Sequence, residues 1–160
     1  MAFISFTQVS LPYGWLGNMS PYPIMYDDKI WRTSEALFQA LRFSDPVIQE
    51  LIREQKSPMA AKMKAKGNKE SYNITPMSDN DVENMKLCLD LKFNQHTELR
   101  QKLIRTGEHM IIEDIGERRG PRHQFWGAYK THENTWIGQN KMGELLMELR
   151  SSLQVEDSAR

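Results

Sequence analysis

TSEALFQALRF, from Thr33 to Phe43, is the stretch that decides how the middle of the chain folds. Its apolar residues recur at helical spacing, which predicts a helix with one buried stripe formed by Ala36, Leu37, Ala40 and Leu41. Glu35, Gln39 and Arg42 stand at i, i+4 and i+7, so they share a second face beside that stripe. A carboxylate, an amide and a guanidinium next to a core are candidates for a functional site.

Length and charge limit the class of protein. The 160 residues suit one domain, which we place at residues 1–153, with a flexible tail at residues 154–160. The single cysteine, Cys88, excludes a disulfide framework within the chain and favours a reducing compartment. Basic and acidic residues number 21 each, so no bulk charge attracts nucleic acid or a membrane. We expect a cytoplasmic monomer without membrane attachment, because the N-terminal stretch shows no basic leader and no long apolar run.

The pattern along the chain predicts an α+β fold, mainly helical, with a small β-sheet or hairpin. Strands are expected at 3–6, 23–27 and 109–114, with a hairpin at 26–31 that turns around Asp27 and Asp28. Residues 116–124 form a basic loop, and residues 68–77 a polar connector. Thr33 and Ser57 are expected to cap helices, and Gly67 and Gly107 to end them. Helices are predicted at 33–43, 46–55, 58–67, 78–96, 96–108 and 140–153.

The sequence lacks the motifs of several large enzyme classes. There is no glycine-rich phosphate loop and no Gly-x-Ser-x-Gly elbow. The four histidines lack metal-ligand spacing, and one cysteine cannot complete a zinc site. We therefore expect no metal and no cofactor, and chemistry centred on a carboxylate in a pocket.

Four blocks of the sequence together resemble the NADAR family. They are LGNMSPYPI (16–24), WRTSEALFQALRF (31–43), KFNQHTELRQKLIRTG (92–107) and the stretch from FWG (125–127) to TWIGQNKMGELLMELR (135–150). The resemblance implies a mainly helical α+β domain with a cleft lined by these blocks. It also implies an N-glycosidase that cleaves a bond to ribose, either in phosphoribosyl intermediates of riboflavin synthesis or in ADP-ribosylated guanine.

The resemblance gives roles to the polar face of the helix at 33–43. Glu35 matches the Glu of the family's T-S-E motif and is expected to stabilise a ribose cation, act as nucleophile or activate water. The alternative is a first-turn Glu that only satisfies backbone donors. Gln39 is expected to bond a ribose hydroxyl or to hold the Glu35 carboxylate. Arg42 either pairs with phosphate or is a solvated surface residue.

Further substrate-binding residues are expected in the other blocks. Asn18 lies in a turn that the family places beside the substrate, and it also suits a left-handed turn. Trp126 offers a flat face to a nucleobase, although a lone Trp is more often core. Gly138, Gln139 and Asn140 lead into the last helix, where Asn140 is a natural N-cap and the free N–H groups suit a phosphate.

Two residues are candidates for additional catalytic roles. Lys62 is a possible nucleophile or phosphate partner, or else a surface lysine of a Lys-rich helix. His123 stands where relatives commonly carry an acid, so it either acts as acid/base or marks an altered activity. The departure at His123 leaves a second hypothesis, a module that senses NAD or ADP-ribose without cleaving it. The expected partner is a small nucleotide, or ADP-ribosylated guanine that can belong to a nucleic acid.

Overall fold

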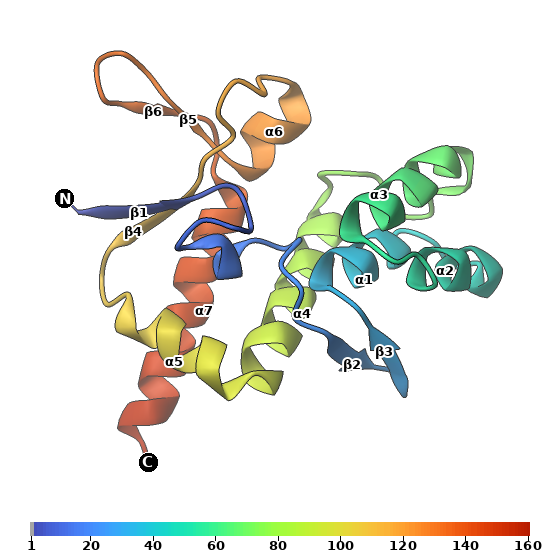
Figure 1. The fold of residues 1–160 in the computed structure, drawn as a ribbon, viewed down its shortest axis with the longest axis horizontal. Coiled ribbons are helices and arrows are strands. Elements are labelled where there is room, and N and C mark those ends of the chain that lie inside the picture. The colour runs from blue at the N-terminus through green and yellow to red at the C-terminus, as the bar shows by residue number, and fades with distance from the viewer. Residues whose placement is uncertain (1) are drawn as a thin grey trace. The chain divides into compact units, whose positions relative to one another are not determined.

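The computed structural model describes residues 2–160 and confirms a mainly helical α+β fold (Figure 1). The chain divides into two units. Unit 1 comprises residues 2–17 and 97–160, and unit 2 comprises residues 18–96. Within residues 2–160 no helix combines the length and the apolar character needed to cross a bilayer.

Unit 2 is built around the helix predicted from TSEALFQALRF. Thr33 caps it as expected, because its hydroxyl accepts from the Ala36 amide at 3.1 Å. The helix contacts three others and strand β3, so all its residues are buried rather than one stripe alone. Ser57 also caps as predicted, and Pro58 follows at the first helical position. The helices of unit 2 are α1 (Ser34–Ala40), α2 (Pro46–Arg53), α3 (Pro58–Gly67) and α4 (Asp79–Gln95).

The predicted hairpin lies in the same unit. Strands β2 (Ile24–Tyr26) and β3 (Lys29–Trp31) pair antiparallel, with Ile24 opposite Trp31. The two turn residues Asp27 and Asp28 have φ of 51° and 60°, the left-handed geometry of a tight two-residue turn. The polar connector contains one short 3₁₀ turn, η2 (Lys69–Ser71).

Unit 1 contains the two longer strands. β1 (Phe3–Phe6) pairs in parallel with β4 (Met110–Glu113), so both predicted strands are confirmed. Helix α7 packs against β4 and against α5. The 3₁₀ turn η1 (Gly14–Leu16) lies in the aromatic loop that follows β1. The remaining elements are α5 (Thr97–Arg105), α6 (Pro121–Trp126), β5 (Tyr129–Lys130), β6 (Trp136–Ile137) and α7 (Lys141–Ser158).

The structure differs from the sequence-based expectation at three places in unit 1. The predicted loop 116–124 overlaps α6, which begins at Pro121. The hairpin β5–β6 was not predicted, because strands of two residues leave no periodic signal. Helix α7 continues to Ser158, so residues 154–158 of the expected tail are helical. Arg100 of α5 supplies a physical reason: its guanidinium pairs with Glu156 at 3.0 Å and with Asp157 at 2.9 Å.

Candidate active site

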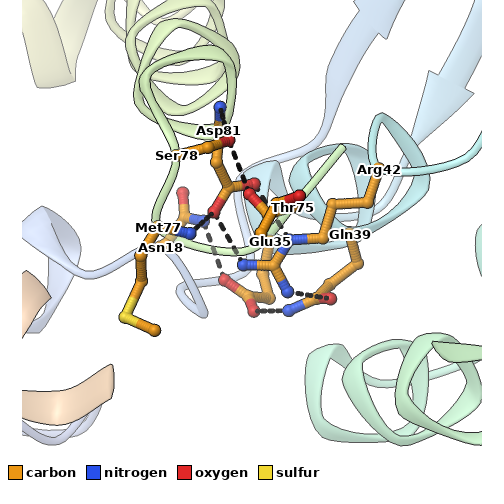
Figure 2. Close-up of polar contacts among 8 residues, drawn as sticks. All are labelled: Asn18, Glu35, Gln39, Arg42, Thr75, Met77, Ser78 and Asp81. Atoms are coloured by element: carbon orange, nitrogen blue, oxygen red, sulfur yellow. Dashed lines mark hydrogen bonds and ion pairs between the residues drawn. The ribbon is translucent and has the colours of Figure 1, made fainter. Parts of the chain in front are cut away.

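A buried polar network surrounds Glu35 in unit 2 (Figure 2). One carboxylate oxygen of Glu35 accepts a hydrogen bond from Asn18 Nδ2 at 2.8 Å, and the other accepts from Gln39 Nε2 at 2.8 Å. Only 8% of Glu35 is exposed, against 5% of Asn18 and 4% of Gln39. The carboxylate is thus held from both sides by neutral amide donors in a largely dry setting.

The orientation of both amides follows from their other contacts. The Ser34 hydroxyl donates to Asn18 Oδ1, which turns the Asn18 NH₂ group toward Glu35. Arg42 Nη1 donates to Gln39 Oε1 at 3.3 Å, which turns the Gln39 NH₂ group toward the other carboxylate oxygen. Since both neighbours present donors, both carboxyl oxygens of Glu35 are placed as acceptors.

Asp81 of α4 anchors the far end of the network. Its carboxylate receives two parallel bonds from Arg42, from Nε and Nη2, each at 2.9 Å. The Met77 amide donates to the same carboxylate at 2.8 Å. Burial opposes the charge of Arg42, but the hydrogen bonds and the charge of Asp81 outweigh it, so the pKa of Arg42 is raised. The guanidinium also lies 4.7 Å from the ring centre of Phe38.

These contacts bear on three of the predicted residues. Gln39 holds the Glu35 carboxylate, and its contact with a ribose hydroxyl stays a prediction. Arg42 is 5% exposed, so its interpretation as a solvated residue is wrong. Its pairing with a phosphate stays a prediction, and Asp81 now occupies two of its donors. Asn18 does not adopt the left-handed backbone that its place in a turn suggested, and its side chain instead bonds Glu35.

Replacing Asp81 by Asn is expected to destabilise the protein by about 3 kcal/mol, because Arg42 would remain buried without its counter-charge. Chemical unfolding monitored by circular dichroism measures the loss. Asp79→Asn is the matched control, since Asp79 is an exposed carboxylate in the first turn of the same helix. Equal losses in both variants would contradict a special role for the buried ion pair.

Lys92 is a buried polar residue near this network that the sequence analysis missed. It lies on α4, none of it is exposed, and its Nζ donates to Ser20 Oγ at 2.9 Å. Burial lowers the pKa of Lys92 from 10.5 to about 7. Cys88 lies one turn earlier on the same helix. Burial raises the pKa of its thiol, and the negative charges of Glu35 and Asp81 raise it further.

A signal for Lys92 was present in the sequence. Met85, Leu89 and Phe93 mark the apolar stripe of the helix, and Lys92 stands seven residues after Met85, on that stripe. A lysine at such a position is rarely buried without a reason. The predicted lysine, Lys62, lies instead on α3 and is half-buried. Helix α3 contacts α1, so Lys62 belongs to the same group of helices as Glu35.

The other predicted site residues belong to unit 1. Trp126, at the end of α6, is 8% exposed and stands edge-on to Phe125 with ring centres 4.9 Å apart. His123 lies on the same helix, and its Nε2 is 3.2 Å from Arg122 Nη2. Because a guanidinium can only donate, that ring nitrogen is the acceptor and carries no proton to give. This contact disfavours His123 as an acid acting through Nε2.

Asn140 shows a role that differs from the predicted one. It precedes α7 with a left-handed backbone at φ 52°, but its side chain makes no capping bond to the helix. The side-chain amide of Asn140 instead bonds the backbone of β4. Its Oδ1 accepts from the backbone N–H of Glu113 at 3.0 Å, and its Nδ2 donates to Ile111 O at 2.9 Å. The side chain therefore continues the sheet at the edge of β4, and the prediction of side-chain capping is wrong.

Gly138 and Gln139 approach α6 and the residue after it closely. The backbone N–H of Gln139 donates to Gln124 O at 2.7 Å, and the backbone N–H of Asn140 donates to Gly127 O at 3.1 Å. These two N–H groups are therefore not available to a phosphate. Gly138 and Gln139 border a hollow of about 410 Å³ together with Arg119, Gln124 and Phe125. Arg119 of the basic loop lies 3.5 Å from the ring centre of Tyr129.

Gly138→Ala is expected to destabilise the protein by about 2 kcal/mol or more. Gly138 has φ of +138°, and a Cβ there would stand 2.3 Å from Gly127 O. Thermal unfolding gives the measurement, with Gly67→Ala as the control, because a Cβ at Gly67 meets nothing within 4 Å. A loss at residue 138 no larger than at residue 67 would refute the argument.

Comparison with known proteins supports the resemblance seen in the sequence. The NADAR domain model matches residues 5–154. The N-glycosidase YbiA of Escherichia coli is 37% identical over 96% of this chain and 89% of its own length. A riboflavin biosynthesis protein of Vibrio vulnificus is 28% identical over 89% of this chain, which spans 36% of that protein. The solution structure of E. coli YbiA superimposes with a TM-score of 0.76 at 32% identity, covering 99% of this chain and 89% of that one. The chain belongs to the NADAR domain family.

Proposed function

We propose that this protein is an N-glycosidase that hydrolyses the bond between a ribose C1 and a nitrogen. The observation that carries the proposal is the Glu35 carboxylate, buried and held through both oxygens by two oriented amides. Breaking such a bond places positive charge on the ribose, and a fixed anion in a dry site stabilises that charge well. The names of the YbiA relatives agree with this chemistry.

The proposed reaction requires only the substrate and one water molecule. The C1–N bond breaks, and its electron pair leaves with the nitrogen, which takes up a proton. The oxygen of water forms the new bond to C1 and releases a proton. Glu35, as an acceptor, is suited to stabilise the cation and to orient or deprotonate the water. Its two amide donors disfavour a role as the acid that protonates the leaving group.

Lys92 joins Lys62 as a candidate for a second catalytic group. A lysine attacks carbon only as the neutral amine, and a pKa of about 7 provides that form near neutral pH. The segment 18–20 connects it to the site, because Asn18 contacts Glu35 while Ser20 contacts Lys92. We propose that the Lys92 amine assists at C1, either as nucleophile or by accepting the proton of water.

The substrate is proposed to be a nucleotide-like ribosyl compound. The two candidate classes are phosphoribosyl intermediates of riboflavin synthesis and ADP-ribosylated guanine. Trp126 is proposed to contact the base. Gly138 and Gln139 are proposed to contact the phosphate-bearing part through the hollow that they border, and Asn140 to position this turn, because the backbone N–H groups of Gln139 and Asn140 already donate within the protein. Arg119 supports phosphate binding, because it borders the same hollow as Gly138 and Gln139.

The test is a substrate panel read by mass spectrometry. The purified protein is incubated with ADP-ribosylated guanosine, a phosphoribosyl intermediate of riboflavin synthesis and NAD, and released base or amine is measured. Calorimetry with ADP-ribose is run in parallel. Free base or amine supports the enzyme. Binding of ADP-ribose without any product would instead support the non-catalytic sensor, which the unusual residue His123 leaves as the second candidate.

A further inference from the structure

The outer edge of strand β1 in unit 1 has no partner strand among residues 2–160. In the parallel pair β1–β4, Ala2 O accepts from the Met110 amide at 3.1 Å and Phe6 O from the Asp114 amide at 2.8 Å. Ile4 is in register with Ile111, so the backbone groups of the even-numbered residues face β4. The N–H and C=O groups of Phe3 and Ser5 therefore face the opposite edge, where no described strand pairs with them.

A hollow of about 720 Å³ is bordered by this strand. Phe3, Ile4 and Ser5 form one wall, and the aromatic loop with Tyr13 and Trp15 forms another. Lys102 and Arg105 of α5 complete it, together with Thr106 and His109 from the segment that follows α5. The hollow thus combines unpaired backbone donors and acceptors, apolar surface and positive charge.

The charge of the hollow points to an acidic occupant. Lys102 Nζ stands 5.7 Å from the ring centre of Trp15 and 3.4 Å from Glu98, whose side chain is 76% exposed. Arg105 is exposed and forms no ion pair with any residue in the described part of the chain. Basic residues in the last turn of a helix interact favourably with the helix dipole, which explains the presence of Lys102 and Arg105 on α5. It does not explain why they border a hollow that β1 also borders.

The backbone edge distinguishes a peptide from a nucleotide. An extended peptide can pair with both the donors and the acceptors of Phe3 and Ser5, as strands added to sheet edges do. A nucleobase would need an open aromatic face. Here Lys102 stands over Trp15, and the Tyr13 ring leans against it at 48° with ring centres 6.4 Å apart. We propose that this hollow, separate from Glu35 and its network, binds an acidic peptide segment as an added strand on β1.

Fluorescence anisotropy with three labelled probes tests the proposal: a peptide of alternating Glu and Val, its Lys and Val counterpart, and an oligo-dT strand. The Glu-Val peptide is expected to bind and the Lys-Val peptide not. Ser5→Pro removes one outward N–H and leaves the ladder to β4 intact, because proline is tolerated at that side of an edge strand. It should weaken binding about tenfold, whereas Ser5→Ala should change it less than about twofold.

Lys102→Glu with Arg105→Glu should likewise weaken the Glu-Val peptide by about tenfold or more. In the unaltered protein, the peptide should protect the Phe3 and Ser5 amides from hydrogen exchange, which tests the pairing even if Ser5→Pro folds poorly. No binding of the Glu-Val peptide, or equal binding by the Ser5 variants, would overturn the proposal. Preference for oligo-dT without amide protection would overturn it in favour of a nucleic-acid surface.

Discussion

Glu35→Gln is expected to lower kcat roughly a thousandfold on any substrate that the unaltered protein cleaves, with KM changed little. Gln has the size of Glu but not its charge, so the ribose cation would lose its stabilising anion. The new NH₂ group would also face the donors of Asn18 and Gln39, which now hold the carboxylate. The folded structure should persist, because the same helix is covered on several sides by apolar contacts.

Steady-state kinetics with mass-spectrometric detection of the released base measures this effect. Glu70→Gln is the control, since Glu70 is an exposed carboxylate of the same unit. Circular dichroism and thermal unfolding establish that Glu35→Gln remains folded. If the folded variant turned over at the normal rate, Glu35 would not be the catalytic carboxylate, and the proposed mechanism would have to be abandoned.

Lys92→Met should lower kcat by roughly a hundredfold or more and at the same time stabilise the protein near neutral pH. Met fills a similar volume without a charge to desolvate, whereas the Lys92 amine is fully buried. Loss of activity together with a gain in stability would separate a functional lysine from a structural one. If activity were unchanged, Lys92 would have no part in the reaction.

The pH dependence of stability provides a second measurement on the same pair of proteins. The pKa of Lys92 is lowered from 10.5 to about 7 on folding, so between these values the unfolded chain binds the additional proton. Stability of the unaltered protein should therefore rise with pH from about 7 to about 10, relative to Lys92→Met, by up to ~1.4 kcal/mol per pH unit. Below pH 7 the difference between the two proteins should be constant. Urea unfolding at several pH values measures it, and parallel curves throughout would contradict the lowered pKa.

The activity should show the same titration. If the neutral amine is the active form, kcat rises with pH through about 7 and levels off above it. Reduction with borohydride during turnover distinguishes the two proposed roles of Lys92. A covalent ribosyl adduct on Lys92 would identify it as the nucleophile, and its absence with the same pH profile would identify it as the base.

Local features of this protein follow from the sequence because they depend on neighbouring residues. The spacing of Glu35, Gln39 and Arg42 places them on one helical face wherever the helix lies, and Thr33 caps that helix through its own hydroxyl. The hairpin turn at Asp27 and Asp28 is local in the same way. The resemblance of four blocks to the NADAR family could also be recognised without coordinates, and the family match confirms it.

Only the tertiary structure decided the partners. Asn18 stands 17 residues before its partner Glu35, and Asp81 stands 39 residues after its partner Arg42. No periodicity in the sequence predicts such pairings. The same holds for Asn140, whose amide bonds strand β4 rather than its own helix. The lowered pKa of Lys92 likewise depends on what covers it. Hydrogen bonding within a helix is set by spacing along the chain, whereas desolvation and long-range pairing depend on how the elements pack.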